Sequence, residues 1–372
     1  MIYFDNAATT FPKPITVAQS VGTAVRKFGG NPGRSGHILS VRTSEQVFAV
    51  RDLAADFFNA QSENVVFTLN CTHAINMAIK GVVSRGDHII ISSLEHNSVS
   101  RPAYSLARRS GVELSMLKVS ESDDVTIRRF KALIKDNTKA VVMTVCSNVT
   151  GQILPYKEIA KICKKRGIIY IADAAQAAGV IPLGLDDGFD FICAPGHKGL
   201  YGPAGTGLLI SNGEHPLATI IEGGTGATSL ELEQTGFLPE RLESGTVNTV
   251  GIIGLGAGIR FVNKLGIKRI YNHEMRLTNR FLRGLKNIED ITVLSGGEHR
   301  SAVVSFNKQG YESNELAQLL SGRGFCLRGG YHCAGLTHKY LGTEKTGAVR
   351  FSPSVMNKEA EVDALLRTLR NI

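Results

Sequence analysis

The chain has 372 residues, of which 43% are hydrophobic and 20% charged, and this is an ordinary composition for a globular protein with an ample core. No basic stretch followed by an apolar segment opens it, so no signal peptide is expected, and its longest apolar stretch, 168–183, is too short and too polar to span a bilayer. The net charge of +9 comes from scattered basic residues without interleaved aromatics, which argues against nucleic-acid binding and leaves an acidic protein partner open.

Six cysteines occupy positions 71, 146, 163, 193, 326 and 333, and no two of them form a Cys-x-x-Cys pair. A chain of this size without a secretion signal is not expected to use them as a disulfide framework. We therefore expect the protein in a reducing cytoplasm.

The first two thirds of the chain alternate between helical periodicity and short apolar runs. The expected order is helix 43–58, strand 65–69, helix 72–83, strand 88–92, helix 97–109, strand 140–145, helix 156–166, and strands 168–172 and 189–193. Continuous apolar strands separated by helices indicate an α/β domain whose sheet is covered on both faces. Ligands bind such sheets near the carboxyl ends of the strands.

The pattern of predicted elements changes near residue 249, where long helices and short strands begin. Helices are expected at 251–263, 268–286, 313–321 and 358–369, and short strands at 292–294, 302–306 and 348–351. This pattern indicates a smaller α+β domain. We predict a large domain of residues 16–250 and a small domain made of residues 1–15 and 251–372.

Three chemical groups stand out in this arrangement. Lys198 follows a strand-like run and lies in a glycine-rich turn, and Asp173 and Asn148 also lie just past apolar runs. A lysine that can form a Schiff base, with an acid near the pyridine nitrogen, is what a pyridoxal phosphate (PLP) enzyme needs. Far downstream, Cys333 offers a thiol nucleophile. Together they suggest a PLP enzyme that moves sulfur.

The order of the motifs resembles the class V aminotransferase family of fold-type I PLP enzymes and, within it, the cysteine desulfurases. The matching segments are Tyr3–Thr10, Gly30–His37, Glu95–Asn97, Ser147–Gly151, Asp173–Gln176, Gly196–Lys198, Glu243–Thr249, Arg328–Ala334 and Val349–Arg350. The resemblance spans nearly the whole chain. It implies a large domain with a mostly parallel sheet flanked by helices, plus the smaller α+β domain.

The resemblance also assigns the cofactor's ring contacts. Lys198 matches the lysine that binds the cofactor, and Asp173 matches the carboxylate that keeps the pyridine nitrogen protonated. Gln176 matches the residue at the ring hydroxyl, with Asn148 nearby. His96 matches the aromatic side chain stacked on the ring face.

The phosphate needs hydroxyls and backbone N–H groups at a helix N-terminus. Thr72 and the His73 amide, at the start of a predicted helix, match such donors, and His197 matches a further phosphate ligand. Thr246 matches a residue delivered by the partner subunit, which implies a homodimer with the site at its interface.

Two positions depart from the family pattern. Pro195 stands where related enzymes usually carry a phosphate-binding serine, and proline supplies neither the hydroxyl nor a backbone donor. Cys71 replaces a hydroxyl residue common beside Thr72. We expect somewhat reduced phosphate affinity or a compensating donor.

The remaining matches concern L-cysteine as substrate. Arg350 matches the arginine that grips the carboxylate bidentately, assisted by Asn148, and Arg328 matches another active-site arginine. The resemblance implies that Lys198 removes the α-proton and that the Cys333 thiolate attacks the substrate sulfur, leaving a persulfide and alanine.

The loop that carries Cys333 is short. Basic neighbours, His332 and Arg328, are expected to favour the Cys333 thiolate. The 17 positions between Cys333 and Arg350 (350 − 333) match the short catalytic loop of group II desulfurases.

Several alternatives stay open. A class V PLP aminotransferase would use Lys198 and Arg350 without Cys333. A selenocysteine lyase or a cysteine sulfinate desulfinase has nearly identical PLP machinery. A non-enzymatic sulfur-transfer scaffold is disfavoured by Lys198, Asp173 and Cys333. The sequence does not reveal the sulfur-acceptor protein, nor whether the sulfur serves iron–sulfur clusters, tRNA thiolation or other cofactors.

Overall fold

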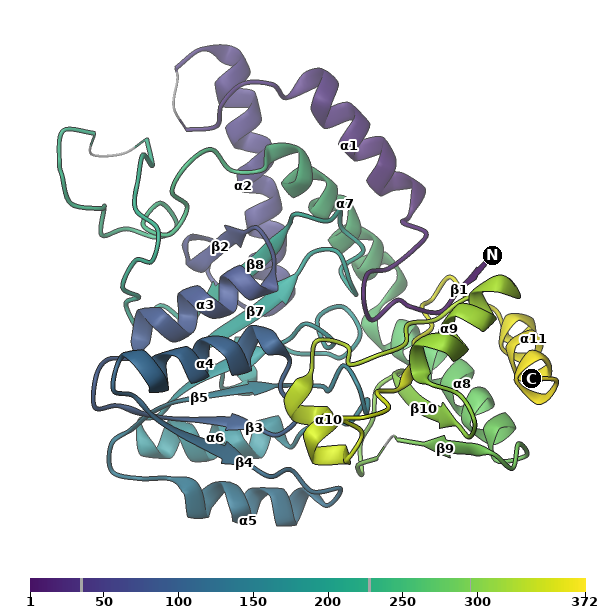
Figure 1. The fold of residues 1–372 in the computed structure, drawn as a ribbon. Coiled ribbons are helices and arrows are strands. Elements are labelled where there is room, and N and C mark those ends of the chain that lie inside the picture. Colours follow the sequence, from purple (N-terminus) through teal and green to yellow (C-terminus); the bar gives the residue numbers. More distant parts are fainter. Residues whose placement is uncertain (34–35, 227–228, 295) are drawn as a thin grey trace.

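A computed structural model describes residues 1–33, 36–226, 229–294 and 296–372. Its centre is a seven-stranded sheet in the order β2-β8-β7-β6-β5-β3-β4 (Figure 1). The strands are β2 Val65–Thr68, β3 His88–Ser92, β4 Glu113–Leu117, β5 Thr138–Thr144, β6 Ile169–Asp173, β7 Phe191–Pro195 and β8 Gly207–Ser211. Only β8 runs antiparallel to its neighbours, so the mostly parallel sheet is confirmed.

Helices cover both faces of this sheet. One face packs on α3 and α4, and the other on α2, α5, α6 and α7 (Figure 1). These helices and the neighbouring α1 are α1 Ile15–Lys27, α2 Ile38–Phe58, α3 Cys71–Val82, α4 Asn97–Arg109, α5 Asp123–Leu133, α6 Tyr156–Arg166 and α7 Thr249–Leu265.

The central strand β5 shows why the sequences of the strands are unbroken apolar runs. Val141 and Met143 point into the core beneath α2, α5, α6 and α7, whereas Ala140 and Val142 point into the core beneath α3 and α4. Because successive side chains of a strand face opposite sides, a strand buried on both faces must be apolar throughout.

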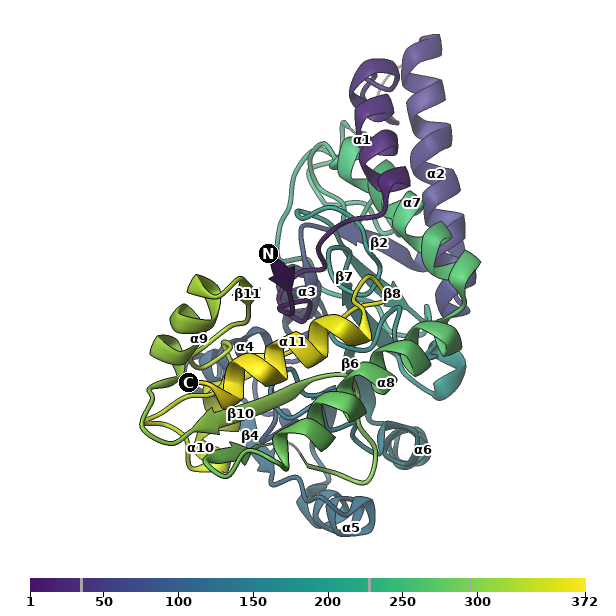
Figure 2. The same ribbon diagram turned by 90° about the vertical axis from the view of Figure 1, so that its right-hand side faces the viewer.

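A second core lies beside the sheet and holds both ends of the chain (Figure 2). Its elements are β1 Ile2–Tyr3, α8 Ile267–Leu285, β9 Ile291–Val293, β10 Val304–Lys308, α9 Ser313–Gly322, β11 Phe325–Cys326, β12 Val349–Phe351 and α11 Glu359–Arg370. β1 pairs with β11, and the rings of Phe4 and Phe281 lie 4.7 and 4.1 Å from that of Phe351. The first residues of the chain thus pack with its last third.

Most expected elements are present within a few residues of their predicted bounds. The strands β1, β4, β8 and β11 and the helices α1, α5 and the short α10 Gly335–Leu341 were not predicted. β4 is an edge strand with Glu113 and Met116 exposed, and its sequence lacks a continuous apolar run because Glu113 and Ser115 interrupt it. Arg34 and Ser35 of the Gly30–His37 motif lie outside the described residues. In the described part of the chain, no single helix has the length and hydropathy to cross a membrane; α7 and α8 pass that test only jointly, across an 80° bend.

Candidate functional site

The predicted site residues converge on one cavity at the carboxyl ends of the central strands. Its volume is about 210 Å³. Nine of the twelve predicted residues line it, namely Thr72, His96, Asn148, Asp173, Gln176, His197, Lys198, Arg328 and Arg350. They come from segments spread over almost 280 positions, and the sheet order brings them together.

Lys198 lies in the turn that follows β7. Within the described residues its amine makes no hydrogen bond or ion pair, although Asp173 lines the same cavity. Burial lowers the pKa of this amine, and the Asp173 carboxylate partly opposes that effect. A lysine with a lowered pKa is a better nucleophile and base near neutral pH.

Asp173 ends β6 and is 2% exposed. Its Oδ1 accepts a hydrogen bond from the Ala175 amide at 2.9 Å and lies 3.6 Å from the Cys71 thiol. Its Oδ2 accepts from the Ser98 hydroxyl at 3.5 Å. The Asp173 carboxylate is therefore fixed by two helix starts, α3 and α4, on the wall of the cavity.

His96 caps the N-terminus of α4. Its Nδ1 accepts the Ser98 backbone N–H at 3.0 Å and lies 2.8 Å from the Ser98 hydroxyl. Burial lowers the pKa of the imidazole to about 4, with Asp173 opposing the shift. The ring is therefore neutral near pH 7, and because Nδ1 is the acceptor, the proton must sit on Nε2.

Glu95 and Ser98 are site residues that sequence reasoning missed. The fully buried Glu95 carboxylate accepts the Thr144 amide with both oxygens at 3.0 Å and also bonds the Ser92 hydroxyl. This contact ties the end of β3 to the end of β5 and so fixes the segment that carries His96. In the sequence, Glu95 belongs to the matching segment Glu95–Asn97, and Ser98 directly follows that segment.

Arg350 is almost completely buried, at 1% exposure. Its Nη1 donates to the Asn148 carbonyl at 3.1 Å and its Nη2 bonds Asp5 Oδ1 at 2.7 Å. Its Nε has no partner among the described residues. An orphaned buried donor of a guanidinium on a cavity wall fits an incoming carboxylate.

Cys333 lies at the rim rather than in the cavity, on the loop that starts α10. It is exposed, and its Sγ lies 3.6 Å from Arg328 Nη2. The expectation that a positively charged His332 favours the Cys333 thiolate is wrong. Burial lowers the pKa of His332 to about 2, and its Nε2 must donate to the Arg328 carbonyl at 3.1 Å, so the ring is neutral.

Two predicted phosphate ligands lie outside the cavity lining. The His73 amide donates to the Asn70 side chain at 2.9 Å, as the cap of α3. Thr246 is exposed and lines a different pocket of about 350 Å³ with Phe48 and Leu238. Within one chain, Thr246 does not join the other site residues.

The family description Aminotransferase class-V matches residues 2–365. A protein of Methanothermobacter thermautotrophicus named "Probable cysteine desulfurase" is 33% identical over 381 residues, which cover 100% of this chain and 94% of that protein. The apo structure of a cysteine desulfurase from Thermococcus onnurineus has a TM-score of 0.92 at 32% identity, covering 100% of this chain and 94% of the other. A cysteine desulfurase structure from Escherichia coli gives 0.88 at 27% identity, covering 99% and 94%.

Proposed function

This chain belongs to the class V aminotransferase family, and from that premise we propose that it is a PLP-dependent cysteine desulfurase, which converts L-cysteine to L-alanine and holds the sulfur on Cys333. One observation carries the proposal. A single cavity combines a lysine amine that has no hydrogen-bond partner in the described part of the chain, a fixed carboxylate and a buried arginine, with an exposed thiol at its rim.

The donor set of the cavity fits the PLP cofactor. We assign Lys198 as its covalent anchor, Asp173 to the pyridine nitrogen, Gln176 and Asn148 to the ring hydroxyl, and His96 to the ring face. When bound, PLP supplies an electron sink for the α-carbon of the substrate. The neutral His96 suits the ring face because it adds no charge beside Asp173.

The phosphate end is the less complete part of the proposed site. Thr72 and His197 line the cavity and supply donors, whereas Pro195 lacks one and Cys71 directs its thiol to Asp173 and the Cys193 carbonyl. The His73 amide contributes only if its bond to Asn70 opens. This incomplete set supports a contribution from Thr246 of a second copy.

The substrate carboxylate is proposed to bind Arg350, with Asn148 and Arg328 beside it. This role is supported by the Nε of Arg350, which has no hydrogen-bond partner among the described residues. Lys198 Nζ is proposed to take the α-proton. The Cys333 thiolate then attacks the substrate sulfur: an S–S bond forms, the bond between the sulfur and the β-carbon breaks, and the β-carbon takes the electron pair and a proton. Lys198 then returns a proton to the α-carbon, which completes alanine. Arg328 Nη2 lies 3.6 Å from Cys333 Sγ, beside the place of this attack.

The assembly is proposed to be a homodimer. Two large apolar side chains are exposed at the pocket that Thr246 lines: Phe48, at 56%, lines the pocket, and Phe237, at 76%, precedes its lining residue Leu238. Exposed apolar side chains of this size are typical of an interface. A cytoplasmic location and an unidentified sulfur-acceptor protein remain part of the proposal.

The two-domain division also stays a proposal. α7 packs on the core of the large sheet through Ile252, Leu255 and Ile259. That packing argues for a boundary nearer Leu265 than residue 250.

The test is product analysis with site mapping. Purified protein reconstituted with PLP should turn over L-cysteine to alanine and protein-bound sulfane sulfur. Borohydride reduction and peptide mapping should place the pyridoxyl group on Lys198. Pyruvate with pyridoxamine phosphate would indicate an aminotransferase instead, absence of turnover would indicate a scaffold, and a label elsewhere would refute the cofactor assignment.

A further inference from the structure

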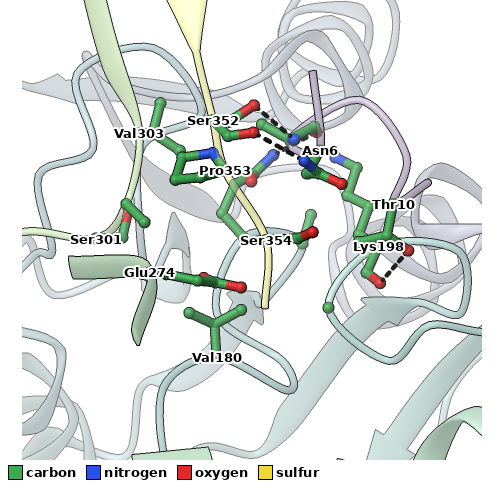
Figure 3. Close-up of a pocket in the computed structure, with 15 residues that line it drawn as sticks. Asn6, Thr10, Val180, Lys198, Glu274, Ser301, Val303, Ser352, Pro353 and Ser354 are labelled. Carbon is green, nitrogen blue, oxygen red and sulfur yellow. Dashed lines mark hydrogen bonds between the residues drawn. The ribbon is translucent and has the colours of Figure 1, made fainter. Parts of the chain in front are cut away.

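The N-terminal strap, residues 5–13, contacts both halves of the site. It is anchored to the segment after β12, where Asn6 Nδ2 donates to the Ser352 carbonyl at 3.0 Å. It is also anchored to the lysine turn, where Thr10 Oγ1 donates to the Lys198 carbonyl at 3.1 Å (Figure 3). A small cavity of about 40 Å³ lies between these anchors, and Glu274 points into it (Figure 3). The first residue of the strap is thus held in place independently of its own side chain.

That first residue is Asp5, the partner of Arg350. Its carboxylate is 19% exposed and lies 2.7 Å from Arg350 Nη2. A guanidinium at 1% exposure needs such a compensating charge, because removing an unpaired ion from water is costly. The Nε of the same guanidinium has no hydrogen-bond partner among the described residues, and Arg350 lines the cavity where a substrate carboxylate would bind.

We propose that Asp5 is a positioning and specificity-determining residue, which orients Arg350 and competes with the carboxylate of the substrate and of the alanine product. The proposal rests on the proposed function for one point, the use of Arg350 as the carboxylate receptor. Asp5 itself need not touch the ligand.

Competition follows from placing two carboxylates on one guanidinium. They attract the same cation but repel each other, so Asp5 lowers the affinity that Arg350 alone would have for a carboxylate. Asparagine at this position keeps a hydrogen-bond acceptor for Nη2 and removes the charge. Alanine removes both the charge and the orienting bond.

The experiment compares ligands with and without a carboxylate. The PLP-loaded wild type, D5N and D5A are titrated with L-cysteine and with cysteamine, which has the amine and thiol but no carboxylate, and the change in cofactor absorbance gives an apparent dissociation constant. D5N should bind L-cysteine about three- to twentyfold more tightly, a range set by one screened charge pair, with little change for cysteamine. D5A should bind L-cysteine more weakly than D5N. With L-alanine, D5N should show stronger product inhibition.

Two control variants distinguish a failure of the proposed role of Arg350 from a failure of the inference about Asp5. D363N removes the charge of Asp363, which forms a surface ion pair with Arg280 at 2.6 Å. This control should change the affinity for neither L-cysteine nor cysteamine. R350Q should remove the preference for L-cysteine over cysteamine; if it does not, the proposed role of Arg350 fails. If R350Q removes the preference while D5N leaves the ratio unchanged, shifts both ligands equally or weakens L-cysteine, the inference about Asp5 alone is overturned. Thermal unfolding confirms that each variant is folded.

Discussion

The ion pair between Arg51 and Glu243 is predicted to stabilise the segment that carries Thr246. Both side chains are less than 10% exposed, at 7% and 8%. Two parallel bonds of 2.7 and 2.9 Å join them, and Glu243 also accepts the Phe67 amide at 2.6 Å. The Arg51 guanidinium lies 4.5 Å from the centre of the Phe67 ring. Glu243→Ala would leave the buried arginine without its counterion.

The cost of that change follows from the burial. Removing one partner of a buried pair typically costs about 3–5 kcal/mol because a charge is left uncompensated. For a chain of this size, at roughly 2 °C per kcal/mol, the midpoint of thermal unfolding should fall by about 6–10 °C. Replacing both residues, Arg51→Met with Glu243→Leu, removes the charges together and should recover most of the loss.

The assay is thermal and denaturant unfolding followed by circular dichroism at one fixed protein concentration, since a dimer's stability depends on concentration. Glu113→Ala is the matched control. It breaks a pair with Lys135 in which both side chains are 51% exposed, and it should leave the midpoint unchanged. A loss below about 1 kcal/mol in Glu243→Ala, or a double variant less stable than the single one, would refute the reasoning.

Three further predictions concern the site and its surroundings. Cys333→Ala should keep the cofactor spectrum and lose sulfur transfer from L-cysteine by several orders of magnitude, while activity towards selenocysteine survives much better. If this variant desulfurates L-cysteine at nearly the wild-type rate, the nucleophile is not Cys333, and Cys326 or another thiol must be tested. Light scattering should find a homodimer at assay concentration, and an active monomer would contradict the delivery of Thr246 by a second copy. Burial raises the pKa of Glu274 from 4.5 to about 8, so the folded chain holds a proton there that the unfolded chain releases above pH 4.5. Stability should therefore fall between about pH 4.5 and 8, by at most about 1.4 kcal/mol per pH unit from this group, and Glu274→Gln should reduce that slope in unfolding curves measured at pH 5 and pH 8. An unchanged slope would show that Glu274 ionises normally.

The sequence by itself determined five of the seven strands of the sheet, β2, β3, β5, β6 and β7, and the place of three polar residues just past apolar runs. Apolar runs such as that of β5 indicate strands buried on both faces, and polar residues that directly follow parallel strands meet at one edge of the sheet. That rule brought Asn148, Asp173 and Lys198 to one cavity, as predicted. The strands follow from local periodicity, which neighbouring residues encode, whereas the roles of the other site residues follow from the resemblance to the class V aminotransferase family.

Only the tertiary structure decided how the charges of the site are paired. Asp5 and Arg350 are separated by 345 positions, and their contact depends on β1 joining the core that contains β12. The neutrality of His332 depends on how deeply its loop is buried, and the exclusion of Thr246 from the cavity depends on the path of a long surface segment. Charge and burial are set by distant segments once they have packed, and no local pattern in the sequence encodes which segments those are.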